Sequence, residues 1–130
     1  MKTLVLTYIL LLLGTLTYSQ TNTIKVRKPD NQNIDIGKKL FKQNCSACHS
    51  ETDAFITGPN LVGVTNRVPS KKWLILWIRS SSDLIKSGDA YANKIADQYA
   101  TAQPDFKFLS DEEINNIITY IDTFVARPKK

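Results

Sequence analysis

The chain has 130 residues, which is enough for one domain of ordinary size and not for two. Its net charge is +5, but the basic residues are spread along the chain and no nucleic-acid-binding motif accompanies them, so a DNA- or RNA-binding protein is excluded. The chain has only two cysteines, fewer than a secreted domain stabilised by disulfides usually carries.

The start of the chain differs in composition from the rest. Lys2 precedes a largely apolar run from Leu4 to Leu16, and small or neutral residues lead to Ser19. This order is typical of a secretory signal peptide, and the run is shorter than the roughly 20 apolar residues of a membrane-spanning helix. We therefore predict a signal peptide over 1–19, export to the periplasm and no stable membrane span after cleavage. An uncleaved membrane anchor is the alternative.

The rest of the chain predicts a flexible lead followed by an all-α domain. Residues 20–33 are polar and contain Pro29, whereas 34–127 place apolar residues at helical spacing and show no strand-like alternation. Four or five helices are expected, the clearest of them over 35–44, 71–80, 89–99 and from Ser110 to Arg127, with loops over 50–67 and 100–109.

Two of these helices carry more specific signals. Ser110 and Glu113 form a capping-box pattern at the start of the last helix, and Arg127-Pro128 is expected to end it. The segment 71–80 is apolar almost all round in its middle, so we expect that helix to be deeply buried.

The only histidine directly follows the second cysteine, in the sequence Cys45-Ser46-Ala47-Cys48-His49. The pattern C-x-x-C-H is the signature of covalent haem attachment. Two intervening residues let both sulfurs reach the porphyrin edge from one helical turn, and the imidazole then points at the iron from the same side. A zinc site would need more ligands, a thioredoxin-like pair would need a βαβ context, and a disulfide would leave His49 unexplained. We therefore predict one haem c attached through Cys45 and Cys48.

Over about Ile34 to Val125 the chain resembles the class I cytochrome c family. The resemblance rests on a first helix with Gly37 and Phe41 that leads into CSACH, on Gly58-Pro59-Asn60-Leu61, on a tryptophan-bearing middle helix, and on the terminal LSDEEI segment with Tyr120. It implies the cytochrome c fold, in which helices surround one covalently bound haem.

The resemblance also implies roles for individual residues. His49 would be the proximal iron ligand, with its other ring nitrogen donating to the Pro59 carbonyl. Leu61 would belong to the cofactor-binding loop, and Gly37 and Phe41 would pack against the terminal helix near Tyr120. Arg67 or Trp73 could donate to a haem propionate, although a solvated surface position is the alternative for Arg67. For Trp77 we expect plain core packing.

The chain departs from the family at the second iron ligand, which is usually a methionine before a proline. Met1 is the only methionine, and by position Gln103, before Pro104, occupies the place of the missing one. We predict the Gln103 amide oxygen as the ligand. An open or water-filled position is the first alternative, and Lys94, Tyr99 or Lys107 is the second. Without methionine sulfur we expect a lower reduction potential than in a relative with a His/Met pair.

These features favour an electron carrier rather than an enzyme, since no second histidine exists to move protons. The expected partners are redox proteins outside the cytoplasm, namely a membrane respiratory complex and a terminal reductase or oxidase. The segment 73–99 is also similar to cytochromes attached to bacterial respiratory complexes. A haem protein that binds or senses NO or CO is the alternative, because the methionine ligand is missing.

Overall fold

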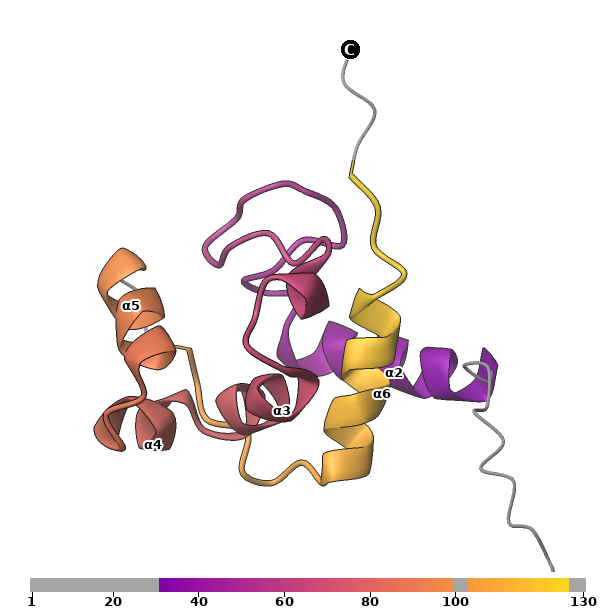
Figure 1. Ribbon diagram of the computed structural model, residues 1–130. Helices are drawn as coiled ribbons and strands as arrows, with labels where there is room; N and C mark the ends of the chain where they lie inside the picture. Colours follow the sequence, from indigo (N-terminus) through magenta and orange to yellow (C-terminus); the bar gives the residue numbers. More distant parts are fainter. Residues whose placement is uncertain (1–30, 100–102, 127–130) are drawn as a thin grey trace, which may run out of the picture.

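The computed structural model describes residues 31–99 and 103–126. The predicted signal peptide, most of the predicted lead and the end of the last predicted helix lie outside these ranges. Within them the chain forms helices and no strand, which confirms the all-α fold (Figure 1). The elements are α2 (Asn31–Asn44), the 3₁₀ turn η1 (Val64–Asn66), α3 (Lys71–Arg79), α4 (Ser81–Lys86), α5 (Ala90–Gln98) and α6 (Asp111–Ile121). None of the described helices has the length and hydrophobicity needed to cross a membrane.

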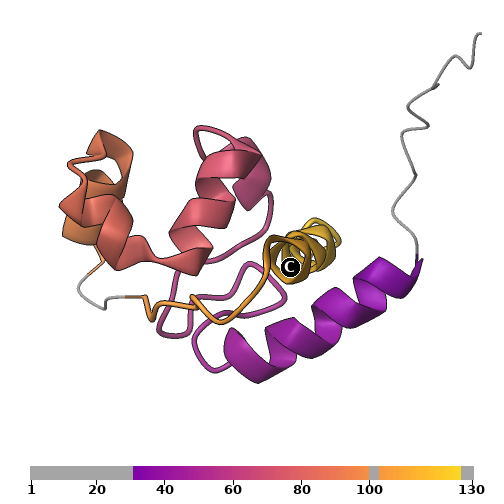
Figure 2. The same cartoon turned by 90° about the horizontal axis from the view of Figure 1, so that it is seen from below.

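The helices form two groups with α3 between them. Helices α2 and α6 cross on one side of α3, and the short helices α4 and α5 lie on the other side (Figure 2). The buried core is mostly apolar and draws on α2, α3 and α6; its fully buried large side chains are Phe41, Ile114, Ile117 and Ile118.

The crossing of α2 and α6 depends on Gly37. A Cβ atom at this position would lie 1.9 Å from the backbone oxygen of Asn116, so only glycine lets the two helices approach this closely. One turn further along α2, the Phe41 ring packs edge-on against Tyr120 and Phe124, with centroid distances of 5.7 and 5.2 Å. The predicted packing of Gly37 and Phe41 against the terminal helix is confirmed.

Replacement of Gly37 by alanine should therefore destabilise the protein, although alanine is the better helix former. Overpacking a dense core costs about 1–3 kcal/mol, and here the obstacle is backbone, which cannot move without shifting α6. We expect Gly37→Ala to lower the free energy of unfolding by about 2 kcal/mol. Urea unfolding measures this, with Lys38→Ala, at the exposed next residue of α2, as the control. Equal midpoints for the two variants would contradict the packing argument.

The helix starts follow local capping. Ser70 accepts the Trp73 amide at the start of α3, and Ser110 and Glu113 form both bonds of the predicted capping box at the start of α6. Two boundaries differ from the prediction. Helix α2 begins at Asn31 rather than Asp35, and α6 ends at Ile121, after which Val125 is 73% exposed.

The prediction for the middle of the chain was wrong in two respects. Helix α4 was not expected, because its six residues are too few to show helical periodicity; Ser80 caps it by accepting the Asp83 amide. Helix α3 is buried on one face only, since Leu76 is 42% exposed while Trp73, Leu74 and Ile78 are buried. The short helices beside α3 do not cover its whole surface, so part of this apolar helix stays exposed.

Candidate cofactor site

The CSACH segment is wound as a tight turn that continues directly from α2. The Cys45 amide donates to the Phe41 carbonyl (2.8 Å), and the amides of Cys48 and His49 both donate to the Cys45 carbonyl (3.1 and 2.9 Å). This winding brings the two sulfurs and the imidazole to one cavity of about 350 Å³, whose lining includes Cys45, Cys48 and His49.

A polar anchor holds this turn against both long helices. Glu51 accepts a hydrogen bond from the Tyr120 hydroxyl of α6 (2.8 Å) and pairs with Lys42 of α2 (2.7 Å). The hydrogen bond from Lys42 lowers the pKa of Glu51, while burial, followed by the nearby Glu51 carboxylate, raises the pKa of Tyr120 to about 12. Both shifts favour the forms that make this hydrogen bond, namely a charged Glu51 and a neutral Tyr120.

The His49 ring is fixed by the loop that follows. Its Nδ1 lies 2.8 Å from the Pro59 carbonyl oxygen, and because a carbonyl only accepts, Nδ1 must carry the proton. The neutral imidazole then has its lone pair on Nε2, which is the tautomer that binds a metal through Nε2. Gly58 packs directly on the ring: a Cβ there would lie 2.5 Å from Cε1. The hydrogen bond expected between His49 and Pro59 is present.

The cavity is bounded by two groups of residues from different parts of the chain. The first wall comprises the CSACH turn with the loop that carries Gly58, Pro59 and Leu61. The second wall comprises residues of α3, α4 and α5, Tyr99 directly after α5, and the segment 103–106; it includes Trp77, Ser81, Ser82, Ile85, Ile95, Tyr99, Gln103 and Phe106. Ile117 and Ile121 of α6 also line the cavity. Leu61 and Gln103, both predicted from the sequence, line the cavity.

Both cysteines are available to form thioethers. Both are free thiols and half-buried. Burial, with a smaller contribution from neighbouring Cys48, raises the pKa of Cys45 to about 11, so its sulfur is neutral at pH 7. A thioether is also neutral and suits this apolar surrounding. No group of three or more His, Cys, Asp or Glu side chains that could hold a metal occurs in the described ranges.

Arg67 and Trp73 do not line the cavity, and a hydrogen bond from one of them to a haem propionate stays a prediction. The Arg67 guanidinium donates to the backbone oxygens of Asn60 (2.8 Å) and Val62 (3.2 Å), so it braces the loop that presents Pro59. The Trp73 indole donates to the Asp89 carboxylate (3.2 Å). One guanidinium nitrogen of Arg67 and the indole nitrogen of Trp73 thus have acceptors within the protein.

Trp77 was predicted as plain core packing; it does pack against the apolar core, and it also borders the cavity. Trp77 lines the cavity and stacks on Trp73, with ring centroids 5.3 Å apart. Its indole N–H donates to the Gln103 Oε1 (3.1 Å), and the Gln103 Nε2 donates back to the Trp77 carbonyl (3.2 Å). Helical spacing placed both tryptophans on α3, but it did not show which of them turns towards the cavity.

The alternative ligand candidates are not equivalent in the structure. Lys94 and Lys107 are exposed and do not line the cavity, and the Lys107 Nζ lies 2.6 Å from an Asp83 carboxylate oxygen. Tyr99 is half-buried and does line the cavity. Iron ligation by Gln103 stays a prediction.

Taken together, the donor set fits a covalently held haem. The two cysteine side chains and an imidazole with its Nε2 lone pair available line one wall of an apolar cavity. Cys45 and Cys48 would hold the porphyrin and His49 the iron, while apolar side chains would cover the ring.

Comparisons with known proteins agree with this geometry. A protein-family model described as cytochrome c matches residues 34–124. The structure is similar to that of cytochrome c from Rhodothermus marinus, with a TM-score of 0.62 and 25% identity over 72% of this chain and 78% of that one. An engineered form of that protein, Rma TDE, gives a TM-score of 0.62 at 25% identity over 73% of this chain and 79% of that one. The same engineered protein bound to a carbene intermediate gives a TM-score of 0.60 at 24% identity over the same shares of the two chains. No curated protein matches the sequence significantly.

Proposed function

The chain belongs to the cytochrome c family, and from this premise we propose that it carries electrons between redox proteins outside the cytoplasm. Members of the family bind haem c covalently and act as haem-based electron carriers that meet redox protein partners. For this chain we propose a membrane respiratory complex as one partner and a terminal reductase or oxidase as the other.

The observation that carries the proposal is the convergence of Cys45, Cys48 and His49 on one apolar cavity. Haem, when bound there, supplies a one-electron iron couple. The protein's own contribution is to hold the imidazole in one tautomer through Pro59, to present both sulfurs to the cavity and to exclude water with apolar side chains. Burial and hydrogen bonding of this kind help to set the reduction potential of a haem.

Charge and the N-terminal segment support the choice of partners and compartment. The chain has a net charge of +5, and Lys38 and Lys39 are exposed on α2, so a partner with an acidic surface would be attracted at long range. The signal-like composition of 1–19 supports periplasmic export, where a covalent link prevents loss of the haem. We propose no catalytic turnover. The only histidine, His49, is the expected iron ligand, so no second histidine is present to transfer protons.

Electron exchange with an anionic oxidant tests the carrier function. The reduced protein, matured in a bacterial periplasm, is mixed with ferricyanide at several salt concentrations in a stopped-flow instrument. We expect rapid, fully reversible one-electron oxidation whose rate falls as salt rises, because the protein is basic and the oxidant is an anion. A haem that cannot be cycled, or a matured protein found only in the cytoplasm, would contradict the proposal.

A further inference from the structure

The cavity lining offers few groups that could complete the coordination of a haem iron held by His49. Haem iron in proteins is held mainly by histidine, cysteine, methionine or tyrosine. Within residues 31–99 and 103–126, Tyr99 is the only lining residue of these kinds apart from His49 and the two haem-attaching cysteines, and Gln103 adds an amide oxygen. The second axial position therefore depends on whether either side chain is free to move to it.

The Gln103 side chain is held in place at both ends. Its Oε1 accepts the Trp77 indole N–H at 3.1 Å, and its Nε2 donates to the Trp77 carbonyl at 3.2 Å. If the Gln103 oxygen moved to a metal, the half-buried Trp77 indole N–H would lose its acceptor. A donor shielded from water and left without an acceptor costs free energy. The paired amide still has one N–H and one lone pair unused, so it can serve as a polar group of a ligand pocket without leaving Trp77.

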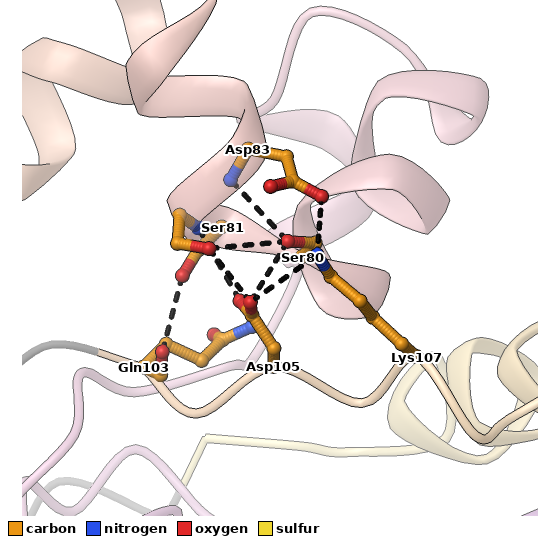
Figure 3. Close-up of polar contacts among 7 residues, drawn as sticks. Ser80, Ser81, Asp83, Gln103, Asp105 and Lys107 are labelled. Atoms are coloured by element: carbon orange, nitrogen blue, oxygen red, sulfur yellow. Dashed lines mark hydrogen bonds and ion pairs between the residues drawn. The ribbon is translucent and has the colours of Figure 1, made fainter.

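The segment that carries Gln103 is itself fastened to the start of α4 (Figure 3). The Asp105 carboxylate accepts hydrogen bonds from the Ser80 hydroxyl (2.9 Å), the Ser82 hydroxyl (2.6 Å) and the Ser82 amide (3.3 Å). The Ser81 hydroxyl donates to the Gln103 carbonyl at 3.1 Å. Backbone and side chain of Gln103 are thus both tied to helices of the second wall.

We propose that the cavity takes a small neutral diatomic ligand at the iron position that His49 does not occupy, with the Trp77–Gln103 pair as the polar part of its pocket. This inference rests on the proposed function, because it requires haem in the cavity. In this proposal, the second wall binds a small molecule from solution and does not supply a side chain to the iron.

Carbon monoxide is the probe, and the reduced, haem-loaded protein is the sample. If the position is open, the observed association rate rises linearly with carbon monoxide concentration and does not level off. We expect Gln103→Ala to change the association rate by about threefold at most, the effect of one weak hydrogen bond. Gln98→Ala, an exposed glutamine of α5 outside the cavity lining, is the matched control and should leave the rate unchanged.

A protein ligand would give a different result, because it must leave before carbon monoxide enters. An association rate that levels off, or no binding at all, would overturn the inference. If the association rate then rose linearly with carbon monoxide concentration in Gln103→Ala or in Tyr99→Phe, the replaced residue would be identified as the ligand. These outcomes require haem in the wild type, whereas a purified chain without haem would refute the proposed function itself.

Discussion

Replacing both Cys45 and Cys48 by alanine should abolish covalent attachment of the haem while leaving the helical fold recognisable. The two sulfurs lie on one turn that faces the cavity, and no other cysteine exists in the chain to take their place. The double variant can hold haem only through His49 and apolar contacts, which denaturation removes. Staining for haem after denaturing electrophoresis should therefore be lost completely, while each single variant keeps one thioether.

The matched control for this experiment is Ser46→Ala, between the two cysteines. The Ser46 hydroxyl only donates to the Lys42 carbonyl (2.8 Å) on the outside of the turn, so this variant should stain like the wild type. Covalent haem that persists in the double variant would mean that another side chain makes the link, and the assignment of the site would be wrong.

Replacing Gly58 by alanine should displace the His49 imidazole. The new Cβ would lie 2.5, 2.8 and 2.9 Å from ring atoms Cε1, Nδ1 and Nε2, so the ring must tilt and strain its hydrogen bond to Pro59. Loss of comparable supporting contacts costs metal sites roughly 10–100-fold in metal affinity. We expect altered ferric absorption and electron paramagnetic resonance spectra, with the haem still attached through both cysteines.

Gly88→Ala separates this effect from the general cost of replacing a glycine. Gly88 has a φ of 81°, and a Cβ there would meet nothing within 4 Å. This control should lose about 1–2 kcal/mol of stability through backbone strain and keep the wild-type spectra. Superimposable spectra for Gly58→Ala and the wild type would contradict the proposed role of Gly58 in positioning His49.

The parts of the fold that local chemistry decides could be predicted from the sequence. The capping box of Ser110 and Glu113 depends on residues three apart, and Ser70 caps the next residues along the chain. The haem-attachment turn is equally local, because five consecutive residues supply both sulfurs and the imidazole. Gly37 could be predicted as a close helix contact because an interior glycine weakens a helix unless another backbone needs the space.

The second wall could not be predicted in the same way. Trp77 and Gln103 are 26 residues apart in the sequence, and only the folded chain shows that the indole and the amide pair. Arg67 was expected at a haem propionate or on the solvated surface, and its hydrogen bonds to two backbone oxygens could not be foreseen, because such acceptors have no signature in the sequence. Helix α4 is too short for periodicity, so the sequence did not show that Ser80 and Ser82 bind Asp105 at its start.

The mass of the purified mature protein, measured after denaturation, tests the central claim most directly. The account predicts the polypeptide plus one haem, with neither Cys45 nor Cys48 open to alkylation. A bare polypeptide mass, with both thiols alkylated or joined in a disulfide, would contradict it.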